Sequence, residues 1–357
     1  LDDKSSGLPI LYLDSYTNFG GDDWKTLYFR NTFWQFNDTL TYSTGRHTFK
    51  LGAEYRRRKE DDYFAVFPAG SFYVGNYDTS FEMSWWQGHE MASLLMGYPS
   101  YSFLGRRFGN HVLEDRQYAA FVQDDWKVGS KLTLNLGLRY DYGTPFFSPT
   151  NELSMFDVDQ GRILIAGEDG VSRYIVNPDK NNLATRLGAV YQPDPKTTVR
   201  GGFGVFYTPE TAKRDDLRHN PPFYRQAVLY DQWTFSDPAP PALPEPSDYP
   251  TGYDTYSVDR NLRNGYSLQY SIAVQRELPG GLLFEAAYVG SGSNRLPFVV
   301  DVNQAQSDGT PAPFPGIGKV QTVQAIGDGD YHSGQFKLER RFRQGLFMLA
   351  TYTWSKS

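Results

Sequence analysis

Five tight turns recur along the chain, and each lies between two stretches in which apolar and polar side chains alternate. In the clearest example, residues 116–142, the second arm has two unlike faces. The apolar face consists of Leu132, Leu134, Leu136, Leu138, Tyr140 and Tyr142, and the polar face of Lys131, Thr133, Asn135, Gly137, Arg139 and Asp141. A period of two requires an extended strand between two different environments. The repeated pattern therefore predicts antiparallel β-hairpins.

The length of this arm, about twelve residues, indicates a strand that crosses a membrane. A tilted strand needs about nine to eleven residues to cross hydrocarbon, whereas strands of soluble proteins average about five or six. The four other turns have similar arms and lie at residues 44–46, 194–195, 279–280 and 344–345. Aromatic residues gather towards the strand ends, as interfacial girdles require. Asp38 and Asp124 interrupt their apolar faces, so either they lie near a headgroup region or the register shifts there.

Composition and charge exclude two other classes of protein. The net charge of −6 argues against a nucleic-acid-binding protein, which needs a basic face. A helical membrane protein is excluded by a mean hydropathy of −0.54 and by the lack of any run of about eighteen apolar residues. A β-barrel escapes such a test because half of each strand is polar. The chain has no cysteine, so it has neither disulfides nor thiolate metal sites.

The unequal spacing of the turns predicts the topology. Short turns on the periplasmic side would alternate with long extracellular loops at residues 58–113, 143–181, 208–264 and 293–330. We therefore expect an all-β fold, namely an antiparallel transmembrane β-barrel wall of about ten long strands in five hairpins.

Two of these loops have a character of their own. Residues 80–98 have helical spacing and predict a short amphipathic helix, whose apolar stripe would contain Phe81, Trp85, Met91, Leu94 and Leu95. We expect this helix to pack on the barrel rim or into its mouth, with ligand recognition as the alternative. Residues 237–250 are rich in proline and predict an extended surface strap.

Candidate chemistry is sparse. His89-Glu90 resembles the start of a zinc-protease motif, but Ser93 occupies the place of the second histidine. Residues 157–161 and 328–330 place carboxylates beside glycine without the glutamate that completes a calcium loop, so we expect solvated turns. The glycines of residues 201–204 lack the Lys-Ser/Thr of a phosphate-binding loop and predict bending or close approach. We predict no catalytic residue, metal site, cofactor or enzymatic activity.

The polar faces of the strands carry the site prediction. If the apolar faces meet lipid, the polar side chains point into the lumen, where they are hydrated or paired. The lumen-facing candidates are Asn135, Arg139, Asp141, Arg200, Gln269, Glu285, Lys337 and Glu339. We expect most of them to form salt-bridge ladders between strands, with substrate contact as the alternative for any one of them. The basic run at residues 56–59 predicts a solvated strand end or, as the alternative, a contact with anionic headgroups.

Two neighbouring segments carry a family resemblance. Residues 116–128 (RQYAAFVQDDWKV) and 132–141 (LTLNLGLRYD) resemble the mid-barrel signature of TonB-dependent outer-membrane receptors, most closely the large Oar-like members. Residues 45–52 and 350–357 are similar to further parts of that family. The resemblance implies a barrel of about 22 strands with an N-terminal plug in the outer membrane of a Gram-negative cell envelope. Such a receptor is energised through TonB and moves a bulky ligand across the membrane.

On this interpretation, residues 1–357 are a partial barrel domain without the plug or the TonB-contacting segment. Residues 1–4 show no secretory signal, which predicts a mature or internal piece of a longer protein. The expected partners are outer-membrane lipid, the TonB complex and an extracellular carbohydrate, peptide or metal chelate. The leading function is a receptor or transporter barrel. The alternative is a non-transporting surface β-protein for adhesion or assembly.

Overall fold

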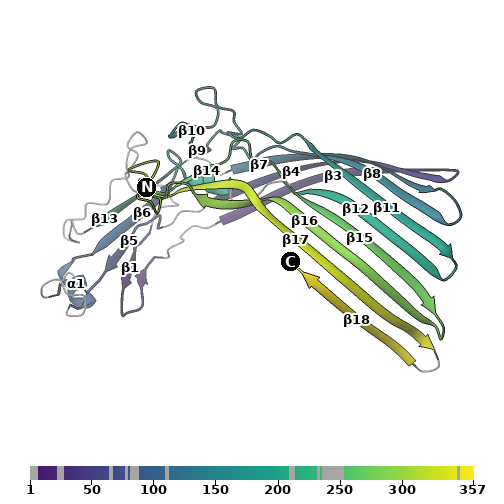
Figure 1. Cartoon of the computed structure of the whole chain (residues 1–357). Coiled ribbons are helices and arrows are strands. Elements are labelled where there is room, and N and C mark those ends of the chain that lie inside the picture. The colour runs from purple at the N-terminus through teal and green to yellow at the C-terminus, as the bar shows by residue number, and fades with distance from the viewer. Residues whose placement is uncertain are drawn as a thin grey trace.

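A large antiparallel sheet dominates the computed structural model of the chain (Figure 1). The structure describes residues 7–21, 28–63, 67–76, 79–80, 88–108, 112–208, 214–230, 234, 253–343 and 346–357. The sheet has eleven strands in the order β14-β17-β16-β15-β12-β11-β8-β7-β4-β3, and β18 pairs with β17 further along the side that also pairs with β14. The long strands run side by side, and their hairpin ends gather on one rim (Figure 1).

Ten of these strands form five consecutive hairpins, which confirms the predicted architecture. They are β3 (Tyr28–Thr44), β4 (His47–Tyr63), β7 (Val112–Lys127), β8 (Leu132–Gly143), β11 (Asn182–Asp194), β12 (Thr197–Thr208), β15 (Gly265–Leu278), β16 (Leu282–Asp301), β17 (Val320–Arg343) and β18 (Leu346–Lys356). The eleventh, β14 (Thr255–Val258), pairs with β17 in parallel. In the described residues, β3 and β18 each pair with a single neighbour, so the wall is open at both edges.

Two predicted loops are shorter than the alternation pattern indicated. β16 continues to Asp301 and β17 begins at Val320, so residues 302–319 form the loop that was expected at 293–330. Likewise, β4 continues to Tyr63. The strands extend beyond the membrane, where both faces meet water or other protein and the period of two is lost. The alternation of apolar and polar residues therefore predicts only the part of each strand that lies in the membrane.

The two faces of the sheet differ in chemistry and exposure. On β8, Leu136, Leu138 and Tyr140 are exposed, whereas the intervening Arg139 and Asp141 are partly buried. The same alternation on the neighbouring strands produces a continuous apolar outer face. In an outer-membrane β-barrel, an apolar band of this kind faces lipid and alternates with polar residues of the interior.

A row of aromatic rings crosses the outer face of four neighbouring strands. Phe36, Tyr55, Tyr118 and Tyr142 lie directly opposite one another in the register of β3, β4, β7 and β8. Their ring centroids are separated in turn by 6.4, 5.2 and 6.1 Å. We call this set the aromatic row. Phe36 and Tyr55 lie eight residues from the turn ends of their strands, and Tyr118 and Tyr142 lie nine and ten residues from theirs. This is about the length of strand that crosses hydrocarbon, so an interfacial girdle is expected at this level.

The two acidic residues on the apolar faces do not mark a change of register. The β3–β4 and β4–β7 pairings run without a shift through Asp38 and Asp124. Asp124 lies near the hairpin end of β7, and its Oδ2 is 2.7 Å from His47 Nδ1. Asp38 lies opposite Ala53, and its Oδ1 accepts a hydrogen bond from the backbone N–H of Thr39 at 2.8 Å. Each carboxylate therefore has a local polar partner.

The segments predicted as irregular loops contain a folded unit. A second sheet has the order β13 (Tyr224–Tyr230), β6 (Tyr101–Arg107), β5 (Ser71–Val74), β1 (Ile10–Leu13) and β2 (Phe19–Gly20). β9 (Ser154–Asp157) pairs with β10 (Arg162–Ile165), and a 3₁₀ helix, η3, spans Arg214–His219. These elements lie at the end of the wall opposite the hairpin turns (Figure 1), and we call them the loop unit.

The loop unit has a hydrophobic core, which also includes the adjoining ends of β7 and β17. Its buried residues are Leu113, Phe146, Leu153, Met155, Leu164, Ala166, Ile175, Val176, Leu217, Val258, Leu262 and Val323. A buried ion pair between Asp62 of β4 and Arg218 of η3 ties the unit to the wall. The wall therefore carries a structured extracellular part rather than loose connections.

The predicted helix is shorter than expected, and its most buried residues are polar. α1 spans Glu90–Met96, begins at the His89 cap and ends at Gly97 in a left-handed conformation with φ 76°. Glu90 and Ser93 are its buried residues, whereas Leu95 is 82% and Met96 is 61% exposed. The Glu90 carboxylate accepts a hydrogen bond from Ser15 N at 3.1 Å, which draws the polar side inwards. Of the expected apolar stripe, Met91 and Leu94 are half-buried and only Leu95 is exposed, so the stripe is buried in part. Phe81, Trp85 and the proline-rich residues 237–250 lie outside the described residues.

The lipid-facing assignment predicts different costs for the same change on the two faces of β15. Ile272 is 54% exposed on the outer face, and Gln269 lies on the opposite face. Ile272→Arg should lower the free energy of unfolding in phospholipid vesicles by about 2–4 kcal/mol, because a guanidinium is placed in hydrocarbon. Gln269→Arg, the matched control, should cost less than about 1 kcal/mol. Equal costs in urea titrations would contradict the assignment.

Acid should loosen the loop unit through His219. The ring packs edge-on against Tyr224, and burial, together with Arg107 and Arg218, lowers the pKa of His219 to about 3. Between its ordinary value near 6.5 and 3, only the unfolded state takes up the proton. The neutral His219 therefore imposes no loss of stability above about pH 6.5, and the free energy of unfolding falls as the pH decreases through this window. Thermal unfolding at pH 7 and pH 5 should show a smaller pH effect in His219→Gln than in the wild type; identical slopes would refute this role.

Candidate functional site: the polar face of the wall

The register places the eight predicted lumen-facing residues on one face of the sheet. Directly opposite residues in an antiparallel pair share a face. Gly137 lies opposite Arg186, Arg186 opposite Gly204, and Gly204 opposite Gln269, which links the polar faces of β8 and β15. Glu285 lies opposite both Gln275 and Lys337, which extends this face to β17. The assignment of the face to a lumen stays a prediction, since the described strands do not close a cylinder.

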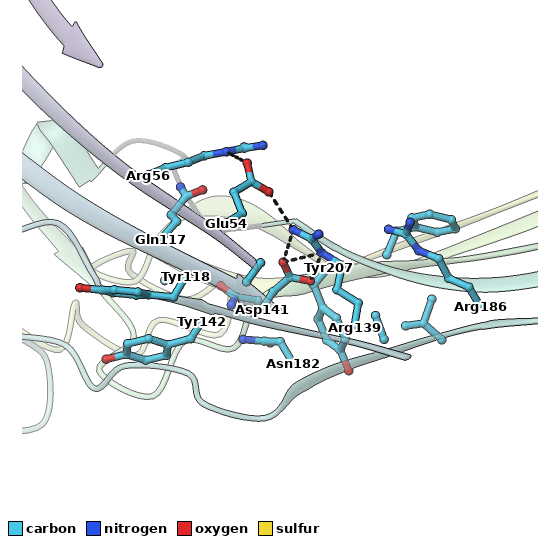
Figure 2. Close-up of a pocket in the computed structure, with 16 residues that line it drawn as sticks. Glu54, Arg56, Gln117, Tyr118, Arg139, Asp141, Tyr142, Asn182, Arg186 and Tyr207 are labelled. Atoms are coloured by element: carbon cyan, nitrogen blue, oxygen red, sulfur yellow. Dashed lines mark hydrogen bonds and ion pairs between the residues drawn. The ribbon is translucent and has the colours of Figure 1, made fainter. Parts of the chain in front are cut away.

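Arg139 is the centre of an ion-pair network on this face (Figure 2). Its Nη2 lies 2.9 Å from Asp141 Oδ1 and 3.3 Å from Glu54 Oε2. Glu54 also pairs with Arg56, so the network joins β4 to β8 across the intervening β7. Each carboxylate thus has at least one guanidinium partner, which offsets the cost of partial desolvation. Arg139 and Asp141 were among the predicted lumen-facing residues, whereas Glu54 was not singled out.

A second network lies closer to the hairpin rim. Asn135 Nδ2 donates a hydrogen bond of 2.7 Å to Asp125 Oδ1, and Lys50 Nζ lies 2.9 Å from Asp125 Oδ2. Asn135 therefore holds a carboxylate of the adjacent strand, as a ladder residue would.

Four of the five remaining candidates form two separate groups on β12 to β17. Arg200 Nη2 is 2.8 Å from Glu285 Oε2 and donates a hydrogen bond to Gln275 Oε1 at 3.2 Å. Lys337 Nζ lies 2.8 Å from Glu339 Oε2 on the same strand. Gln269 belongs to neither group and lines a hollow above Gly202 and Gly204. The structure therefore distributes the candidates over several ion-paired groups rather than one site.

A pocket of about 220 Å³ opens on the polar face near the extracellular ends of β4, β7, β8, β11 and β12. Arg139, Asp141, Asn182 and Arg186 are among the residues that line it (Figure 2). Phe206 also lines it. Their mixture of charged, amide and aromatic groups suits a polar ligand with a planar or apolar part.

Arg186 differs from the other arginines of this pocket. Its Cζ lies 4.9 Å from the centroid of the Phe206 ring, and it has no carboxylate partner within the described chain. Gly204 leaves room for this pair, because a Cβ there would lie 2.7 Å from Phe206 Cε2. This is the close approach that the glycine-rich stretch predicted. Arg186 is therefore a cation stacked on a ring and available to an anionic group.

Sequence reasoning missed both Glu54 and Arg186. Each lies at an odd spacing from the apolar residues of its strand, Leu51 in β4 and Leu187 in β11, so the same period-two count would have selected it. Their partners could not have been named, because they lie on strands that are distant in sequence.

The other motifs have structural explanations. The buried Asp157 accepts hydrogen bonds from the amides of Asp159 and Gln160 and closes the β9–β10 turn. Asp328 and Asp330 lie inside β17 rather than in a turn, so the prediction for them is wrong. No group of three or more His, Asp or Glu residues in the described ranges could hold a metal ion. Nor does the described part include a helix with the length and apolar character needed to span a membrane.

The basic run of β4 is not a solvated strand end. Arg58 Nε lies 2.6 Å from Asp115 Oδ1, and Arg57 Nη2 lies 2.7 Å from Glu114 Oε2. Acidic residues of β7 therefore face this run across the β4–β7 ladder, which the alternation within a single strand could not reveal.

Comparison with known proteins agrees with this geometry. The family model of the outer membrane beta barrel domain matches residues 1–357. The outer membrane transporter YddB from Escherichia coli has a similar fold, with a TM-score of 0.52 and 11% identity over 98% of this chain and 37% of that chain. A mutant (Q482A) of the ferric enterobactin receptor PfeA from Pseudomonas aeruginosa, in complex with enterobactin, has a TM-score of 0.50 and 13% identity over 96% and 37% of the two chains. No curated protein matches the chain significantly in sequence.

These similarities define the fold and the location. The chain spans about 37% of the length of each of the two solved structures. At identities of 11% and 13%, the similarity to these structures shows the fold alone. The apolar outer face, the hairpin topology and the family match all place the protein in the outer membrane. The chain belongs to the family of outer membrane β-barrel domains.

Proposed function

We propose that this chain forms wall and extracellular loops of an Oar-like, TonB-dependent receptor that passes a bulky ligand across the outer membrane. The observation that carries the proposal is the contrast between the two faces of one wall, apolar outside and lined with paired charges, amides and a pocket inside. A polar interior of this kind suits a hydrated conduit for a polar ligand.

The proposal requires partners for the two open edges of the wall. β3 and β18 each present an unpaired row of backbone N–H and C=O groups along one side in the described part. In hydrocarbon, each unsatisfied group costs several kcal/mol, so transmembrane sheets must close. We propose that further strands complete the cylinder and that TonB acts through a plug within it, as the family resemblance implies.

The loop unit would supply the first contact with the ligand. It presents partly exposed Tyr73 and Tyr101, whose stacked rings are 4.9 Å apart, and the exposed Tyr230 beside them. Aromatic surfaces of this type bind sugars, peptides and the organic part of metal chelates, which remain the proposed ligand classes. From there, the ligand would next bind in the polar pocket at Arg186 on the inner face.

Gene deletion tests the proposed function in the native organism. Growth would be measured on single carbohydrate, peptide and metal-chelate sources, in strains with and without the gene and with and without TonB. The proposal expects at least one source whose use requires both. Loss of surface attachment, together with normal growth on every source, would contradict transport and favour the adhesion or assembly alternative.

Within the pocket, Arg186→Gln should reduce uptake of that source by about tenfold, because a charge-assisted hydrogen bond to the ligand is lost. Arg162→Gln is the matched control, since Arg162 is an exposed arginine at the start of β10 in the loop unit. Uptake would be measured with labelled ligand at equal levels of protein in the outer membrane. Equal uptake by both variants would remove Arg186 from the path.

A further inference from the structure

Two arginines face each other on the outer surface of the wall, just beyond the aromatic row. Arg57 of β4 lies directly opposite Arg116 of β7. Both are two residues further from the hairpin rim than Tyr55 and Tyr118, the aromatic-row members on the same strands. Like charges directly opposite one another destabilise a sheet. This arrangement therefore needs a compensating group.

Glu114 supplies that group from the same face of β7. Its Oε2 lies 2.7 Å from Arg57 Nη2, and its Oε1 lies 2.9 Å from Arg116 Nη2 and accepts a 3.0 Å hydrogen bond from Arg116 Nε. The Glu114 side chain is only 3% exposed, and the backbone of Glu114 pairs with that of Phe147. A single buried carboxylate thus fixes two guanidinium groups in one geometry.

The pair keeps a positive charge and unused donors. One carboxylate neutralises one of the two arginines, while the Arg57 and Arg116 side chains are 44% and 45% exposed. Each guanidinium has five N–H donors. Glu114 engages only Nη2 of Arg57 and Nε and Nη2 of Arg116. A third guanidinium, that of Arg173, lies 4.5 Å from the centroid of the Phe147 ring, which Arg116 also contacts at 5.6 Å. These features suit a compact oxyanion that is bound by the two planar guanidinium groups.

The position of the pair on the wall decides which oxyanion it meets. The aromatic row lies on the membrane side, and Trp34, which is exposed, lies opposite Arg57 on β3. Aromatic girdles mark the membrane interface, so side chains one step beyond them lie at the depth of the lipid headgroups. A headgroup phosphate can occupy this place while its acyl chains lie along the apolar face below.

We infer that Arg57, Glu114 and Arg116 form a binding site for the phosphate of an anionic lipid in the extracellular leaflet. Glu114 positions the two arginines, and they bind the phosphate oxygens. The site lies on the outer face of the wall and is independent of any conduit on the inner face. It would remain if the protein transported nothing.

The test uses the full protein in a neutral detergent, with dioleoyl phosphatidic acid as the probe and native mass spectrometry as the measurement. The wild type should retain the lipid, and the double variant R57Q/R116Q should bind it at least about tenfold more weakly, because two charge-assisted contacts are lost. R276Q is the matched control. Arg276 is an exposed arginine on the same outer face, in β15 at the opposite, hairpin end of the wall.

Two comparisons make the outcomes distinct. R57K/R116K keeps both charges but loses the planar forks, so its affinity should lie between those of the wild type and the glutamine variant. It also replaces the glutamine variant if circular dichroism shows that the latter does not fold. Inorganic phosphate should fail to displace the lipid at equal concentration. The inference would be overturned if folded R57Q/R116Q, or R57K/R116K in its place, retained the lipid as well as R276Q does. Binding of inorganic phosphate as tight as that of the lipid would also overturn it.

Discussion

The backbone hydrogen-bond ladder from β3 to β18 is the constraint on which the other features depend. In hydrocarbon no water can satisfy an N–H or C=O group, so each strand must pair with its neighbours. Pairing fixes the register, and the register decides which side chains share a face. A slip of one residue in β11, for example, would move Arg186 from the polar face to the lipid. The apolar surface, the charged inner face and both arginine sites are therefore consequences of one set of backbone bonds.

Two arginine sites on the wall differ from the ion-paired networks around them. In those networks, cations are matched by carboxylates across or along the strands, as Arg139 is by Glu54 and Asp141. Arg186 instead stacks on an aromatic ring, and the Arg57–Arg116 pair shares a single carboxylate. A partly desolvated cation without a full counter-charge is costly. Such positions are where an external anion stabilises the protein most, from the aqueous side in one case and from the bilayer in the other.

The wall could be predicted from sequence because the membrane imposes two environments on every strand. That is why the period of two located all five hairpins and placed Asn135 and Gln269 on one face. The loop unit could not be predicted, because its sheet pairs segments far apart in the chain, such as β6 with β13. The Arg57–Arg116 pair likewise depends on the register between β4 and β7, which no pattern within either strand reveals. The orientation of helix α1 could not be predicted from the spacing of its apolar residues, because Glu90 and Ser93 form hydrogen bonds with residues outside the helix.

The central claim is that successive side chains of each long strand face lipid and water in turn. The chain contains no cysteine, so single cysteines can be placed at Tyr270, Ser271, Ile272 and Ala273 of β15 and exposed to a membrane-impermeant thiol reagent in intact outer membranes. The account predicts labelling at positions 271 and 273 and protection at 270 and 272. Uniform labelling of all four positions, or the inverse pattern, would contradict it.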